Sequence, residues 1–148
     1  MSASGIAVVV SLIAGVAGGV QVGISGAFGR RIGVLEATAF ASVVAAVVVV
    51  AATAAARQGL GGVAQAVHVP PWMWIGGVMG AVVVTTISYA PPLIGTFATI
   101  GLLIAGQLVA GVLIDSLGLF SLERIPLNAA RIGGLILLTA GALLVLKR

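Results

Sequence analysis

Long apolar runs constrain the fold of this chain more than any other feature of its sequence. Residues 43–56 read VVAAVVVVAATAAA and contain no charged side chain. A transmembrane strand would alternate apolar and polar residues, and this segment does not. In hydrocarbon a lone segment has to satisfy its own backbone hydrogen bonds, which a helix does. The segment therefore predicts a membrane-spanning helix, although valine favours strands in water.

Five segments of this kind follow one another along the chain. A helix needs roughly 20 apolar residues to cross about 30 Å of hydrocarbon, and prolines and charges mark the ends of each segment. The first segment lacks a basic n-region and exceeds a typical h-region, so we interpret it as a span and not as a cleaved leader. We expect helices over residues 5–28, 34–56, 72–89, 93–114 and 127–146.

The connections between these segments are short. The longest, residues 57–71, has room only for a weak interfacial helix. We therefore expect residues 1–148 to form a single transmembrane domain. The expected fold class is an all-α integral membrane protein with five transmembrane helices per chain.

The scarcity of charge supports a bilayer environment. Of the 148 residues 61% are hydrophobic and 7% are charged, whereas about a quarter of a soluble domain is charged. So few charges could not cover a surface that faces water. We therefore expect a multi-pass membrane protein, in contact with lipid.

The same composition argues against several functions. The chain has no cysteine and one histidine, His68, so we expect no enzyme, no metal site and no other cofactor. The basic residues lie at the ends of the apolar segments, where orientation in the membrane explains them better than nucleic acid does.

Two polar residues lie deep in the first segment. Gln21 and Ser25 are four residues apart and share a helix face with Gly18. Unpaired polar groups are costly in hydrocarbon and tend to face protein or a water-filled cavity. Gln21 either bonds a neighbouring helix or, with Ser25, contacts a substrate, and both interpretations satisfy the cost of burial.

Further substrate candidates lie in the third and fourth segments. Thr85 and Thr86 belong to the polar stretch TTISYAPP, and Gln107 lies within the fourth segment. Hydroxyl groups can also bond back to their own helix, which is the structural alternative for the threonines.

Charged and aromatic residues mark the membrane interfaces. Asp115 and Arg131 emerge on the same side because a short loop joins the last two segments, so we predict a structural ion pair. Trp72 and Trp74, at the start of the third segment, are expected to be interface anchors. Glu36 lies near the headgroups, so no carboxylate is expected deep in the bilayer.

Four stretches together resemble the YdcZ-like membrane proteins, small members of the drug/metabolite transporter superfamily. They read GGVQVGISGAFG, PWMWIGGVMGA, APPLIGTFATIGLLIAGQLVAGVLIDSLGLF and ARIGGLILLTAGALL, and they extend over nearly the whole chain. The resemblance implies five-helix chains of the inner membrane, each equal to half of a ten-helix transporter, that pair as dimers.

The basic residues show almost no bias between the two sides of the membrane. Five crossings place three of them on the side of the N-terminus and four on the other side. They are Arg57, Arg124 and Arg131 against Arg30, Arg31, Lys147 and Arg148. Orientation follows an excess of Lys and Arg on one side, so we predict insertion in both orientations and an antiparallel homodimer.

The sequence thus favours a small secondary transporter, an exporter of a small polar or amphiphilic metabolite. An inverted, dual-topology homodimer would work by alternating access, since two inverted copies recreate the inverted repeat of many transporters. The alternatives are a narrow channel, or an accessory membrane subunit of fixed orientation that pairs with a homologous partner.

Overall fold

In the computed structural model the described residues, 3–56 and 61–145, form helices and connecting segments, with no strand among them. They divide into two compact units, one over Met1–Pro92 and one over Leu93–Arg148. The all-α class expected from the apolar segments is confirmed.

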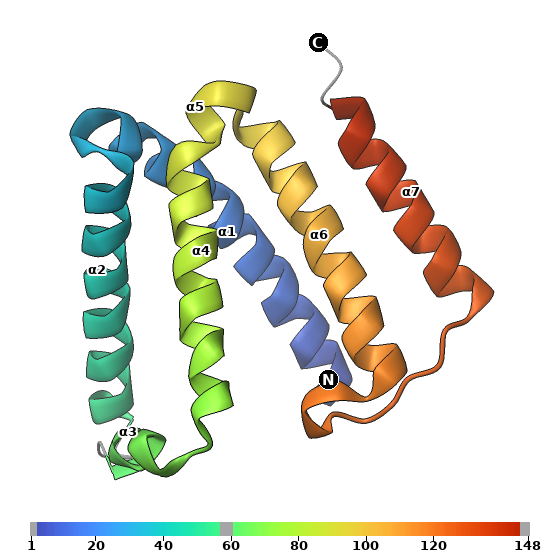
Figure 1. Cartoon of the computed structure of the whole chain (residues 1–148), viewed down its shortest axis with the longest axis horizontal. Helices are drawn as coiled ribbons and strands as arrows, with labels where there is room; N and C mark the ends of the chain where they lie inside the picture. The colour runs from blue at the N-terminus through green and yellow to red at the C-terminus, as the bar shows by residue number, and fades with distance from the viewer. Residues whose placement is uncertain (1–2, 57–60, 146–148) are drawn as a thin grey trace. The chain divides into compact units, whose positions relative to one another are not determined.

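Three long helices make up the first unit. They are α1 (Ala3–Ile32), α2 (Val34–Ala55) and α4 (Ile75–Tyr89), and each contacts the other two (Figure 1). Gly33 alone separates α1 from α2, with a φ of 101°. A residue with a Cβ rarely adopts that conformation, so glycine permits this tight reversal.

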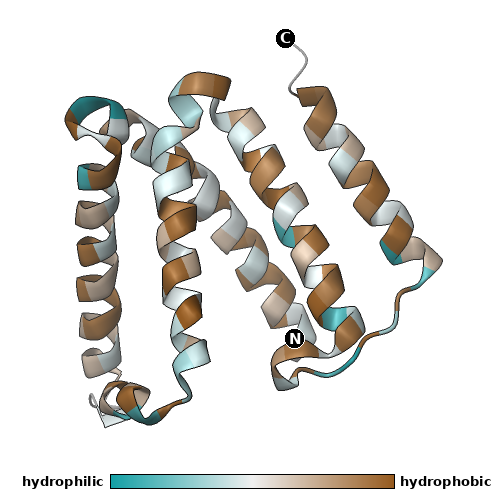
Figure 2. Cartoon of the chain, in the orientation of Figure 1, coloured by the Kyte–Doolittle hydropathy of each residue, from teal (hydrophilic) through white to brown (hydrophobic). Residues whose placement is uncertain are grey.

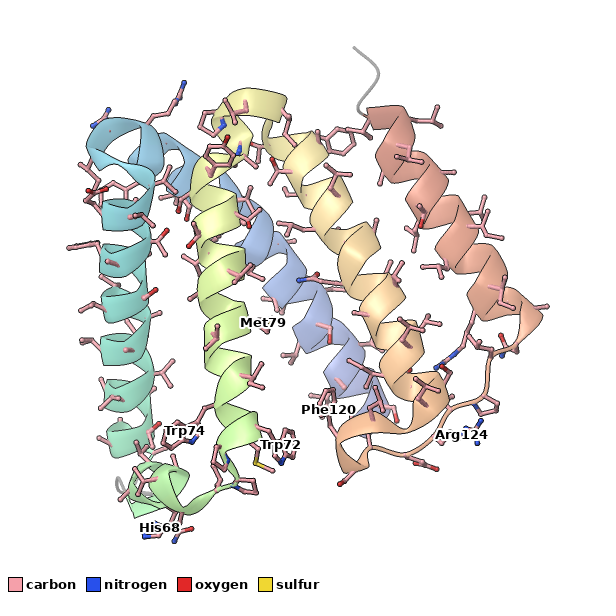
Figure 3. The ribbon with its side chains drawn as sticks, viewed as in Figure 1. His68, Trp72, Trp74, Met79, Phe120 and Arg124 are labelled. Carbon is pink, nitrogen blue, oxygen red and sulfur yellow. The ribbon has the colours of Figure 1, made fainter. Side chains whose placement is uncertain are left out.

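The link from α2 to α4 is largely helical. It contains α3 (Gly61–Ala64), η1 (Gln65–His68) and η2 (Pro71–Trp74). Figure 3 shows His68, Trp72 and Trp74 gathered at this end of the unit. The Trp74 indole nitrogen donates a hydrogen bond of 3.1 Å to the Ala66 carbonyl oxygen, which ties η2 back to the preceding turn.

A close contact joins the C-terminal part of α1 to the end of α4. A Cβ on Gly26 would lie 2.7 Å from the Pro91 Cβ, and one on Gly29 would overlap the Ser88 carbonyl oxygen. Helix α4 ends at Tyr89 because Pro91 has no N–H to continue it, and the short α5 (Pro91–Ile94) follows. The two glycines therefore allow the α1 backbone to approach this turn.

The second unit is a helical hairpin of α6 (Thr96–Leu117) and α7 (Ala129–Val145), with the short η3 (Leu119–Ser121) in the connection. Gly118 ends α6 in the left-handed conformation, with φ 63°, and its N–H bonds the Ile114 carbonyl. Asn128 begins α7, since its Oδ1 accepts a bond of 2.9 Å from the Arg131 N–H.

The observed helix bounds correct the expected ones at several ends. Helix α1 continues past residue 28 through Arg30 and Arg31, because basic side chains are favourable in the last turn of a helix. Regular α-helix starts at Ile75 and not at residue 72, after the 3-10 turn. Helix α6 is shifted from 93–114 to 96–117, since Gly95, with φ 87°, precedes it.

Within the described residues, four stretches are long and apolar enough to cross a membrane. They are Ser4–Ile32, Val34–Ala55, Pro71–Ile94 and Thr96–Leu117. Figure 2 shows apolar residues along the helices and hydrophilic ones chiefly at the connections. The fifth expected span corresponds to α7, which has 17 residues and is shorter than these four.

The close contact at Gly29 leads to a stability prediction. Gly29→Ala places a methyl group against the Ser88 carbonyl, and overpacking of this kind costs about 1–3 kcal/mol. We expect a lower midpoint of thermal unfolding for the purified protein in detergent. Gly23→Ala on the same helix is the matched control, because its added methyl meets no atom of the first unit within 4 Å. Equal midpoints for the two variants would contradict the packing role.

Candidate functional site

Gln21 and Ser25 line one hollow between α1 and α2. The hollow measures about 450 Å³, and most of its wall is apolar, including Phe28 and Phe40. These two rings meet edge to face, with centroids 5.6 Å apart. The structure thus places the amide and the hydroxyl on a common surface, as their spacing of four residues indicates.

The polar atoms of this hollow have no partner among the described residues. The Gln21 side chain is exposed, and Ser25 retains 7% of its accessible surface. Neither side chain makes a hydrogen bond within the described part of the chain. Within the first unit the amide therefore does not bond α2 or α4. Both interpretations from the sequence, a bond to another neighbouring helix and contact with a substrate, stay open.

Thr85 and Thr86 occupy a different hollow, of about 430 Å³ between α2 and α4, together with Tyr89 and Val34. Their hydroxyls donate to the carbonyls of Ala81 and Val82, at 2.8 and 2.9 Å. This back-bonding is the structural alternative considered for the threonines. It uses the hydroxyl donors and leaves only the oxygen lone pairs for a ligand. Because the two hollows have different walls, the threonines and Gln21 do not line one site.

Gln107 lies in a third hollow, of about 350 Å³ between α6 and α7. Gly111 and Asp115 share its wall on α6, while Arg131 and Gly134 share it on α7. The spacing of four residues from Gln107 to Gly111 to Asp115 puts all three on one helix face. That spacing is the sequence signal for this hollow, but the hollow also requires the opposite wall that α7 supplies.

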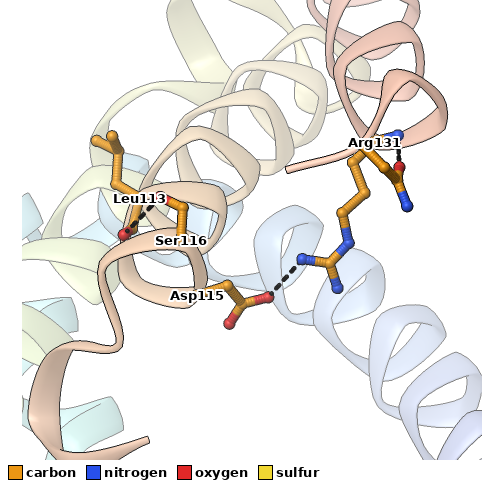
Figure 4. A network of polar contacts seen from close by, with 5 residues as sticks. Leu113, Asp115, Ser116 and Arg131 are labelled. Carbon is orange, nitrogen blue, oxygen red and sulfur yellow. Dashed lines mark hydrogen bonds and ion pairs between the residues drawn. The ribbon is translucent and has the colours of Figure 1, made fainter. Parts of the chain in front are cut away.

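Asp115 and Arg131 meet in the same hollow. The Arg131 Nη1 lies 3.2 Å from the Asp115 Oδ2 (Figure 4). The Asp115 side chain retains 36% of its accessible surface, and the Arg131 side chain retains 34%. The backbone N–H of Ile125 also bonds the Asp115 carbonyl oxygen, at 2.9 Å. The connecting segment is therefore fastened to the end of α6 beside the ion pair.

Arg124 has a role that the sequence analysis did not identify. It lies in the connection after α6 (Figure 3), and its Nε donates a bond of 2.8 Å to the Ser116 carbonyl oxygen. Carbonyls in the last turn of a helix lack intrahelical donors, and basic side chains often satisfy them. The sequence does contain a signal for this role, because Arg124 follows Gly118, the glycine that ends α6, by six residues.

The remaining predicted residues lie at helix ends. Trp72 and Trp74 are exposed in the link before α4, where interface anchors are expected. Glu36 lies in the first turn of α2, with its carboxylate against Gly33. Among the described residues no three His, Cys, Asp or Glu side chains lie close enough together to hold a metal ion.

The long apolar helices define a multi-pass membrane protein. The model of the family described as "Putative inner membrane exporter, YdcZ" matches residues 6–144. The chain belongs to this family, and it is a multi-pass transmembrane transporter of the inner membrane. No curated protein and no solved structure matches the chain.

The ion pair in the hairpin leads to a second stability prediction. Asp115→Asn or Arg131→Gln leaves one charge without its partner, which costs on the order of 3–5 kcal/mol in a fully buried pair. Because both side chains are about a third exposed, we expect a smaller loss, about 1 kcal/mol.

Thermal unfolding of the purified variants measures this loss. The charge swap Asp115→Arg with Arg131→Asp should recover part of it, and Glu123→Gln in the exposed connection is the control. If all four variants have the same midpoint of thermal unfolding as the wild type, the ion pair contributes nothing to the stability of the hairpin.

Proposed function

We propose that the chain is a small secondary transporter that exports a small polar or amphiphilic metabolite. The observation that supports this most directly is the hollow of α1 and α2, where an amide and a hydroxyl with no hydrogen bond to a described residue lie within an apolar wall. In a family of inner membrane exporters, such a hollow is suited to a ligand with one polar group and an apolar part.

Hydrogen-bonding capacity supports the role of Gln21. Its amide offers two donors and an acceptor, and an unpaired polar group is costly where it meets hydrocarbon in place of water. A polar neutral group on the substrate would satisfy the amide and Ser25 together. Gln21 would then contribute most when the substrate is bound and water is excluded.

A second copy of the chain would complete the path. In the first unit a Cβ added at Gly18 or Gly23 meets no atom within 4 Å. Small residues let membrane helices approach closely, so this part of α1 suits contact with another protomer. Five helices are few for an enclosed pathway, and two copies supply ten.

The fifth span and the inverted pairing belong to the same proposal. Helix α7 has 17 residues, at the lower end of the range of about 17–25 found in membrane spans. With five crossings, the basic residues divide three against four; three of these seven, Arg57, Lys147 and Arg148, lie outside the described residues. So weak a bias permits both orientations, and an inverted pair could support alternating access.

The role of Gln21 predicts a loss of transport. A panel of labelled polar and amphiphilic metabolites identifies a compound that cells expressing the chain accumulate less than control cells. In proteoliposomes, Gln21→Leu should lower the flux of that compound about tenfold or more, because the substrate loses its hydrogen-bond partner.

Gln65→Leu is the matched control, since Gln65 is exposed in the link before α4. Both variants should insert, dimerise and unfold like the wild type. A Gln21→Leu protein that fails to fold would instead assign the amide to helix packing. An ohmic current in place of saturable flux would identify a channel.

The inverted pairing predicts two orientations in one membrane. The chain has no native cysteine, so Ile32→Cys and a cysteine appended after Arg148 can each be labelled alone with an impermeant reagent. Partial labelling in intact cells that becomes complete on lysis indicates both orientations. Val47→Cys, within α2, should stay unlabelled in either case. All-or-none labelling at each exposed site would rule out the antiparallel homodimer.

A change of charge bias provides a further check on the same point. Replacing Arg30 and Arg31 with Asn while introducing arginine at Leu119 and Glu123 moves two arginines across the membrane. We expect a single orientation and lower transport activity, since only parallel pairs would then remain.

A further inference from the structure

The hollow between α6 and α7 combines opposite charges with an apolar wall. Asp115 and Arg131 lie at one end, and Gln107 lies two helical turns along α6 from Asp115. Eight residues of helix correspond to about 12 Å along the axis. Between these ends the wall consists of side chains without polar atoms, from Leu108, Val112, Leu135 and Leu138, and of the two glycines 111 and 134.

The ion pair keeps unused hydrogen-bonding capacity. Arg131 has five side-chain N–H donors, and its contact with Asp115 joins one nitrogen to one carboxylate oxygen (Figure 4). No other hydrogen bond links either side chain to a described residue. Donors on the guanidinium and an acceptor oxygen on the carboxylate are thus available side by side.

The balance of charge in this site favours a ligand without net charge. One carboxylate and one guanidinium sum to zero, so a purely anionic or cationic ligand would leave an unbalanced charge among apolar side chains. A ligand with both a negative and a positive group can pair with Arg131 and Asp115 at once. Its apolar part would then lie along the leucines and the valine.

We propose that this hollow binds a small zwitterion with an apolar body, the chemistry of an apolar amino acid. The ligand's carboxylate pairs with the Arg131 guanidinium, and its ammonium pairs with the Asp115 carboxylate. Its apolar side chain occupies the part of the hollow that Gly111 and Gly134 line. This inference rests on the proposed transport function for its purpose, but binding can be measured without transport.

The test uses L-leucine as the probe and the purified full-length chain in detergent. Saturable binding of radiolabelled L-leucine is measured by equilibrium dialysis, with two competitors of the same shape. Isoamylamine lacks the carboxylate and 4-methylpentanoate lacks the ammonium, so each should compete about tenfold to a hundredfold more weakly than unlabelled leucine. Equal competition by either compound overturns the zwitterion assignment.

Filling the hollow separates the site from the structural role of the ion pair. A Cβ at Gly111 meets no atom within 4 Å, so Gly111→Leu can occupy the cavity while Asp115 and Arg131 remain paired. We expect it to abolish leucine binding without lowering thermal stability. Gly106→Leu is the matched control, because Gly106 has equal space but does not line the hollow. Leucine binding by Gly111→Leu at the wild-type level overturns the proposal.

A zwitterionic lipid headgroup also carries one negative and one positive group. A separate binding measurement with a short-chain lipid distinguishes it from a free amino acid. If dihexanoyl phosphatidylethanolamine binds and leucine does not, the hollow recognises a lipid and the assignment to a free solute is wrong. Absence of leucine binding to the wild type overturns it equally. Leucine binding by a chain whose Gln21→Leu variant shows no transport defect supports this site while contradicting the proposed role of the first hollow.

Discussion

The lack of hydrogen-bond partners in hydrocarbon governs most of this structure. A polar group that cannot bond water has to bond protein, and six hydroxyls described within helices do so locally. Each donates to the carbonyl four residues earlier: Thr38, Thr53, Thr85, Thr86, Ser88 and Thr99. The Gln21 amide and Ser25 depart from this pattern, as do Ser11, Ser42, Gln107 and Thr139. Gln21 and Ser25 also line one hollow together, which is why that hollow attracts a functional interpretation.

Glycine has two different uses in the first unit. At Gly26 and Gly29 it permits backbone contact with the turn that follows α4. At Gly18 and Gly23, on the same helix, the space beside the backbone is not filled by the first unit. Helix α1 therefore has a packed end and an open portion. Because all four residues are glycine, the sequence alone does not distinguish the two uses.

Much of the fold could be predicted, since the bilayer permits so few backbone arrangements. The apolar runs gave the helices, and the spacing of Gln21 and Ser25 gave their common surface. The helix ends were predicted less well, because they depend on single contacts such as the Gly118 and Asn128 caps. The hollow of Gln107 escaped prediction because it requires α7 to supply the opposite wall, and no local pattern fixes which residues two helices bring together.

Arg131 joins two structural tasks in one residue. Its backbone N–H bonds the Asn128 cap that starts α7, and its side chain reaches Asp115 on α6. One residue of helix corresponds to a rotation of about 100°, so a slip of α7 by a single residue would turn the guanidinium away from its partner. The pair thus sets the register of the hairpin. It also pairs two opposite charges at the end of α6, so this span can enter lipid without an uncompensated carboxylate at its end.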